Sequence, residues 1–125
     1  MTGRRRSDSE EDRCDRVIRQ LGGTVYDFSL GGRTPFPDVP DRRYRVRGVA
    51  FWCECKSQHD KFTQGQLEFL KAERACGQVV FAGDAKMLTA MLLSTPSTWH
   101  DGGWAALAIV AARGLRKATK TRSLL

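Results

Sequence analysis

The chain has 125 residues, enough for one hydrophobic core and too few for a second independent domain. Its composition, 41% hydrophobic and 28% charged, is that of a globular protein and excludes wholesale disorder. A formal charge of +7 favours a polyanionic partner such as nucleic acid. The longest apolar run, Trp104 to Ala112, is far shorter than the roughly 20 residues that span a bilayer, so we expect a soluble, cytoplasmic protein.

The first predicted element is an amphipathic helix that follows a polar, arginine-rich start. Cys14, Val17, Ile18 and Leu21 recur at helical spacing, and two glycines at 22–23 end the pattern. A short strand is expected over 24–28. The segment 29–40 holds three of the four prolines, so we expect a loop there.

Two strands joined around Gly48 are predicted over 44–56. In the second strand Glu54 and Lys56 point to one face, because side chains alternate along a strand. A polar loop, a helix over 64–75 and a short strand over 79–82 follow, and Asp84 caps a further helix. A last helix over 105–117 leads into a basic tail. This order of elements predicts an α/β fold.

The cysteines suggest reduced thiols. Cys14, Cys53, Cys55 and Cys76 follow no hydrophobic signal segment, which favours a cytosolic compartment. Cys53 and Cys55 could begin a zinc site, but structural zinc usually takes four ligands at paired spacing, and no second cysteine or histidine pair matches them. A zinc-binding domain is therefore disfavoured.

Acidic and basic residues at two places suggest phosphodiester hydrolysis. Asp38 and Glu54 can supply the one or two carboxylates that Mg²⁺ prefers, and the carbonyl of Cys55 is a plausible further ligand. Lys56, on the same face as Glu54, can hold the attacking water and stabilise the developing charge. The alternative is a turn aspartate with a solvated Glu54–Lys56 ion pair. The apolar neighbours of Glu54 disfavour this solvated ion pair, because they indicate a buried position, where an unpaired carboxylate costs several kcal/mol.

Together with a glutamate on the first helix, the stretches PFPDV (35–39), FWCECKS (51–57) and TQGQLEFL (63–70) resemble the VRR-NUC branch of the PD-(D/E)xK nucleases over residues 10–82. The resemblance implies a restriction-endonuclease-like core with a central mixed β-sheet flanked by helices. It also implies Mg²⁺- or Mn²⁺-dependent cleavage of branched DNA, such as Holliday junctions. We expect a single nuclease domain over 1–125, with this core over about 8–95 and the C-terminal helix and basic tail over 96–125.

Site residues follow from the resemblance position by position. Asp38 and Glu54 would be the metal carboxylates, Lys56 the catalytic lysine and Gln66 a residue that orders the site. The spacing of Thr63 and Gln66 also fits a capping box, and both roles can hold at once.

The sequence does not decide which glutamate of the first helix and which aspartate match the family's site residues. Either Glu10 or Glu11 can be the family's glutamate, since Ser7 and Glu10 can themselves form a capping box. Pro40, close after Asp38, interrupts the expected strand, which makes Asp41 a weaker substitute ligand.

Basic residues next to these motifs are expected to follow DNA phosphates. They are Arg42, Arg43, Arg45, Arg47 and Lys61. A rival interpretation is a non-catalytic basic DNA-binding accessory module, but bound phosphates alone would not need the acidic residues, since carboxylates repel DNA. Symmetric cleavage of a junction needs two sites, so we expect a homodimer, with the apolar helix over 105–112 and its neighbouring tryptophans as the interface.

Overall fold

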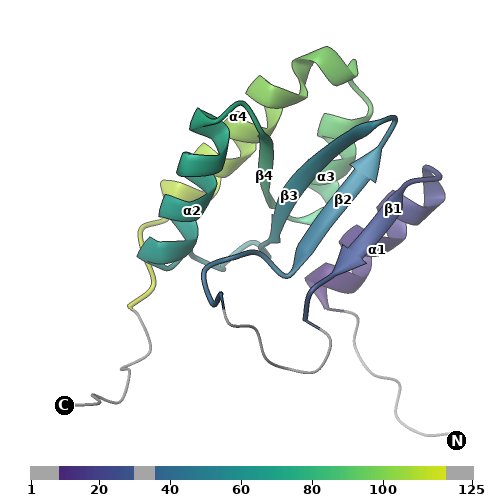
Figure 1. The fold of residues 1–125 in the computed structure, drawn as a ribbon. Coiled ribbons are helices and arrows are strands. Elements are labelled where there is room, and N and C mark those ends of the chain that lie inside the picture. The colour runs from purple at the N-terminus through teal and green to yellow at the C-terminus, as the bar shows by residue number, and fades with distance from the viewer. Residues whose placement is uncertain (1–8, 30–35, 118–125) are drawn as a thin grey trace, which may run out of the picture.

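Four strands form one mixed sheet in the order β1 (Thr24–Asp27), β2 (Arg42–Val46), β3 (Val49–Cys55) and β4 (Val79–Gly83). The structure, a computed structural model, describes residues 9–29 and 36–117. Neighbouring strands are antiparallel except β3 and β4, which are parallel (Figure 1). The helices are α1 (Glu10–Gln20), α2 (Gln64–Ala75), α3 (Ala85–Leu92) and α4 (Trp99–Ala111), with a short 3-10 helix at Pro96–Thr98. The predicted α/β class with a central mixed sheet flanked by helices is confirmed.

The hairpin between β2 and β3 sets the register of the sheet. Arg47 and Gly48 both have positive φ, 54° and 78°, which is the backbone that a tight two-residue turn between twisted strands requires. Val46 therefore faces Val49, and the pairing runs on to Arg42 opposite Cys53. Extended by one residue, the same register brings Asp41 opposite Glu54. The predicted pair of strands around Gly48 is confirmed.

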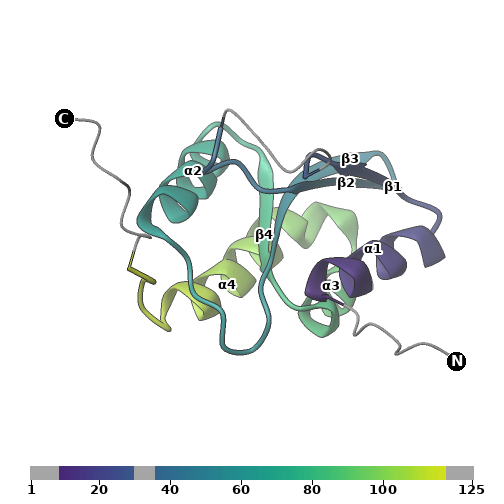
Figure 2. The ribbon, with the colours of Figure 1, turned by 90° about the horizontal axis from the view of Figure 1, so that it is seen from below.

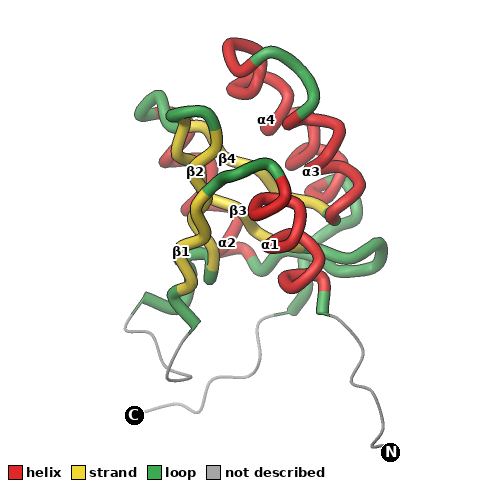
Figure 3. Tube along the Cα trace, turned by 90° about the vertical axis from the view of Figure 1, so that its right-hand side faces the viewer, coloured by secondary structure: helices red, strands yellow, loops and turns green. Residues whose placement is uncertain are grey.

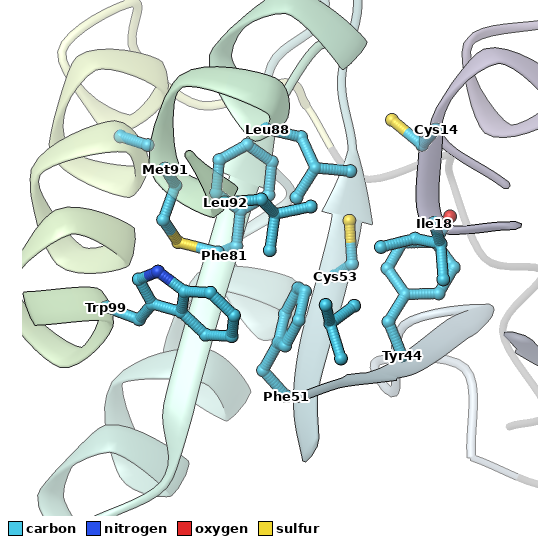
Figure 4. Close-up of a cluster of buried hydrophobic side chains, with 12 residues drawn as sticks. Cys14, Ile18, Tyr44, Phe51, Cys53, Phe81, Leu88, Met91, Leu92 and Trp99 are labelled. Carbon is cyan, nitrogen blue, oxygen red and sulfur yellow. The ribbon is translucent and has the colours of Figure 1, made fainter. Parts of the chain in front are cut away.

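The helices cover the two faces of the sheet unequally. One face packs against α1 and α3, where Tyr44, Phe51 and Phe81 meet Ile18 and Leu88 (Figure 4). The other face packs against α2 only near β3 and β4, through contacts of its Leu67, Phe69 and Leu70. Of the described helices, none lies over β1 and β2 on this second face (Figure 2). The described helices therefore leave this part of the sheet uncovered.

Helix α4 belongs to the core of the domain. Trp99 and Ala106 join the cluster on one side of the sheet, and Leu107 and Val110 join the cluster on the other. Figure 3 shows α3 and α4 as neighbouring helices. The prediction of a helix over 105–117 was wrong at both ends. The helix starts at Trp99 because Gly103 lets it approach β4, where a side chain would collide with the Val80 carbonyl.

The remaining helix and strand predictions are confirmed within one or two residues, and the helix over 64–75 has the predicted bounds. Asp84 caps α3 as expected, since its side chain accepts a hydrogen bond from the amide of Met87 at 2.8 Å. The tail beyond residue 117 lies outside the described residues. Within the described ranges, no helix combines the length and the apolar character needed to cross a membrane.

Candidate active site

Acidic side chains from α1, from β3 and from the residue directly before β2 gather at the open end of the β2–β3 hairpin. Glu54 projects from β3 onto the face that α2 covers in part, and the strand register brings Asp41 opposite it. Glu11, on the first turn of α1, is half-buried and close enough to both acids for their charges to interact. The fold thus brings together three carboxylates that lie far apart in the sequence.

Glu54 is the most constrained of these acids. Burial raises its pKa to about 7, and the negative charges of Asp41 and Glu11 add to the rise, although Lys56 opposes it. Its Oε2 atom is buried and has no hydrogen-bond partner among the described residues. A buried carboxylate oxygen without a donor costs free energy, so this oxygen is available for a cation.

Glu11 and Glu10 have different roles. Burial raises the pKa of Glu11 to about 7, helped by a hydrogen bond with Asp41 and opposed by the charge of Arg42. Glu10 instead turns to α3, where its Oε2 accepts a hydrogen bond of 2.8 Å from the amide of Ala85. Because Ala85 is the first residue of α3, Glu10 caps that helix. Of the two glutamates that the sequence left open, the structure places Glu11 beside the acidic group.

Lys56 lies against the same group with its ammonium held in place. The residue is buried, and Nζ donates hydrogen bonds of 3.1 Å each to the carbonyl of Lys61 and to Oε1 of Gln66. Burial lowers the pKa of Lys56, an effect that Glu54 opposes and Arg116 reinforces. The ammonium is therefore held where its charge interacts with that of Glu54.

Gln66 joins the site to the start of α2. Its side-chain Oε1 accepts a hydrogen bond of 3.0 Å from the backbone amide of Thr63, and the backbone amide of Gln66 donates to Thr63 Oγ1 at 3.2 Å. This reciprocal pair is the capping box of α2. The same oxygen also accepts from Lys56, so the contacts expected for both roles of Gln66 are present.

Asp38 lies at the first turn of α2. It is exposed, and its carboxylate sits against Gly65 in the first turn of α2, where a Cβ atom would overlap it. It is not among the charges that act most strongly on Glu54, whereas Asp41 is. The geometry favours Asp41 over Asp38 as the partner of Glu54. Asp41, which the sequence offered as the weaker substitute ligand, follows Pro40 directly before β2.

Arg42 does not line the open face, contrary to the prediction that it follows DNA. It is buried, and it pairs with Asp15 at 2.9 Å and with Asp27 at 2.8 Å. The hydroxyl of Tyr44 donates to the same Asp15 at 2.7 Å. Arg42 points to the α1 side of the sheet because it alternates with its neighbours along β2. Its role in this structure is to tie α1 to the sheet.

Arg43 and Arg45 point to the open face together with aromatic rings. The guanidinium of Arg43 lies over Trp52, 4.7 Å from the ring centroid, and that of Arg45 lies over Tyr26 at 5.6 Å. These stacked cations share the face of Asp41 and Glu54. Arg47, in the hairpin turn, and Lys61, beside α2, are exposed.

The C-terminal segment also reaches the site. Arg113 donates hydrogen bonds of 2.7 and 2.9 Å to the carbonyls of Ser57 and Asp60, and the amide of Arg116 donates to the carbonyl of Phe62 at 2.7 Å. The charge of Arg116 acts on Lys56. The sequence predicted these arginines at the end of the helix expected over 105–117, and no local pattern reveals the contacts, because they join segments far apart in the chain.

The backbone of Cys55 stands between Glu54 and Lys56, and its thiol turns to the opposite face, toward Cys53. At this end of the sheet the acids and the lysine interact through their charges, and Arg43 and Arg45 lie on the same face. No family model, curated protein or solved structure matches the chain.

Proposed function

We propose that the chain is a metal-dependent nuclease with a restriction-endonuclease-like core of the PD-(D/E)xK type. The observation that carries the proposal is the buried, unpartnered carboxylate oxygen of Glu54, which shares a face with Asp41 and lies beside Lys56. A purely structural carboxylate in this position would need a donor, which the described residues do not supply.

The donor set fits Mg²⁺ or Mn²⁺. Asp41, Glu54 and Glu11 would offer carboxylate oxygens, and Cys55 would offer its carbonyl, which are the hard ligands that such ions prefer. The raised pKa values of Glu54 and Glu11 reflect, besides burial, repulsion that a divalent cation would relieve. When bound, the ion would neutralise charge on the phosphate and make water a better nucleophile.

Lys56 is the catalytic residue in this proposal. Two acceptors, Gln66 Oε1 and the Lys61 carbonyl, engage two of the three N–H donors of its ammonium. The third can face a phosphate oxygen or the attacking water, in a partly desolvated position where its charge acts strongly. Gln66 is a positioning residue, because it acts through Lys56.

The substrate proposed is branched DNA. Arg43 and Arg45 would place the phosphate backbone on the open face of β1 and β2, and Arg116 would add charge on the far side of Lys56. Cutting both strands of a four-way junction would require a two-fold dimer. The expected dimer helix buries Leu107 and Val110 in its own core, which leaves Ile109 as its large exposed apolar side chain.

Cleavage of labelled DNA tests the proposal. Four-way junctions, flaps, splayed arms and linear duplex are each incubated with Mg²⁺ and with EDTA, alongside Lys56→Ala. We expect Mg²⁺-dependent cuts that the variant loses, while its DNA affinity stays within a small factor. Lys61→Ala, an exposed lysine beside the site, is the matched control. Tight DNA binding with no cut by the wild type under any condition would favour a non-catalytic DNA-binding module instead.

A further inference from the structure

Three cysteine side chains from two elements meet on the opposite side of β3 from Glu54. Cys14 on α1 and Cys53 on β3 are fully buried, and Cys55 at the end of β3 is half-buried. Their Sγ atoms all lie within 4.8 Å of one another, and those of Cys53 and Cys55 are 3.6 Å apart. Figure 4 shows Cys14 on its helix and Cys53 on its strand, both within the apolar cluster.

This spacing suits sulfurs that share one metal ion. Two thiolates bound at about 2.3 Å to a common ion lie roughly 3.8 to 4.0 Å apart. The Cys53 and Cys55 sulfurs are slightly closer than this and all three sulfurs lie within 4.8 Å of one another, so small side-chain rotations would bring them into bonding distance. Cys14 was overlooked in the argument against a cysteine metal site, because it lies far from Cys53 and Cys55 in the sequence.

The three cysteines offer only sulfur atoms as metal ligands. Within the described part of the chain, no histidine or carboxylate joins the three sulfurs at this distance. Asp15, next to Cys14, is engaged by Arg42 and Tyr44. Structural zinc sites almost always take four ligands, whereas soft thiolates also select Cu(I), which is stable with three. The donor set therefore favours a monovalent soft ion over zinc.

We propose that Cys14, Cys53 and Cys55 form a binding site for Cu(I), held by three sulfurs. The half-buried Cys55 gives the ion a route from the surface. A bound ion would tie α1 to β3. The site stands on its own geometry and does not depend on nuclease activity.

Titration of the reduced full chain with Cu(I), without oxygen and in competition with a coloured Cu(I) chelator, tests the site. We expect one Cu(I) per chain, a thiolate-to-copper absorption in the ultraviolet and a raised melting temperature. Cys14→Ser and Cys55→Ser should each weaken binding about 100-fold or more. Cys76→Ser, which removes the exposed cysteine outside the cluster, and Glu54→Gln, in the proposed nuclease site, should bind as the wild type does.

The inference is overturned if the wild type binds Cu(I) no more tightly than a triple serine variant of the cluster, or if Cys76→Ser abolishes binding. Tighter binding of Zn²⁺ than of Cu(I) in a parallel titration would equally reject it. Cys55→Ser keeps the test valid if Cys14→Ser fails to fold, because Cys55 is half-buried and circular dichroism reports the fold of each variant.

Discussion

Oε1 of Gln66 lies 3.1 Å from the ammonium of Lys56 and 3.0 Å from the amide of Thr63, so one atom serves both the start of α2 and the lysine. The two roles can be separated by mutation. Thr63→Ala removes the hydroxyl half of the capping box but leaves the Thr63 amide and the Lys56 contact in place. Gln66→Ala removes the amide oxygen that both donors share.

We expect Thr63→Ala and Gln66→Ala each to lose about 1 kcal/mol of unfolding free energy, as is typical for lost caps. Only Gln66→Ala should reduce kcat for DNA cleavage, and its pH profile should change as well, because the ammonium of Lys56 loses an acceptor. Chemical denaturation and cleavage kinetics measure the two effects. Equal losses of kcat in both variants would show that Gln66 contributes only to capping.

A second set of three variants decides between the two aspartates. Asp41→Asn and Glu54→Gln should each abolish cleavage and weaken Mg²⁺ or Mn²⁺ binding in calorimetric titration, because each removes a carboxylate from the site. Asp38→Asn should cleave at close to the wild-type rate, since Asp38 is exposed and sits against α2. The reverse result, loss in Asp38→Asn alone, would reject the ligand set proposed from the structure.

The placement of several site residues could be predicted from the sequence alone. Glu54 and Lys56 share a face because strand side chains alternate, and the strands around Gly48 were predicted correctly. A two-residue turn at Arg47 and Gly48 then pairs Asp41 with Glu54 by counting outward along both strands. The choice of Asp38 instead followed the family motif and did not use this register.

Other features depend on tertiary contacts that no local pattern carries. Arg42 belongs to the same basic run as Arg43, yet an ion pair with Asp15 takes it into the core. The early start of α4 depends on the close approach of Gly103 to β4, while glycines in a sequence ordinarily argue against a helix. Arg116 reaches Lys56 because the segment after α4 returns to Phe62.

Two adjacent glycines of α4 should respond in opposite ways to alanine. Gly103→Ala should destabilise the protein by about 1 to 3 kcal/mol, because its Cβ would collide with the Val80 carbonyl and force the helix away from β4. Gly102→Ala should be neutral or stabilising by up to about 1 kcal/mol, since a Cβ there makes an ordinary contact with Met91 and alanine favours helix. Urea denaturation compares them, and similar effects in both variants would contradict the packing of α4.

Stability in the absence of metal should fall as the pH rises. The pKa of Glu54 is about 7 in the folded chain against an ordinary value of 4.5, so the folded state keeps a proton that the unfolded state releases. This contribution is fully present below pH 4.5 and is lost as the pH rises through 7, by at most about 3 kcal/mol. Glu11 acts in the same direction.

Urea unfolding in EDTA between pH 4.5 and 8 measures this loss. Glu54→Gln should flatten the decline, because glutamine does not titrate, and Mg²⁺ should restore part of the wild-type stability at pH 8. Stability that rises across this pH range, or a variant with the slope of the wild type, would contradict the burial of Glu54 as a neutral acid.

The open face of the sheet gives the last prediction. Arg43 and Arg45 lie over Trp52 and Tyr26 on the side of β2 that also carries Asp41, so DNA held at the site would pass along them. Replacing both arginines with glutamine should weaken binding to all DNA sequences alike. The slope of log affinity against log salt should fall by about 2, because each lost phosphate contact removes roughly 0.9 from it.

The matched control removes two charges from the other side of the molecule. Arg19 and Lys86 are exposed on α1 and α3, the helices that cover the opposite face, so Arg19→Gln with Lys86→Gln should leave the slope unchanged. Binding is measured on a fixed junction across a salt series, with Ca²⁺ in place of Mg²⁺ to silence cleavage. If the arginine pair leaves the slope unaltered while Arg113 and Arg116 variants lower it, the DNA follows the segment after α4 instead of the open face.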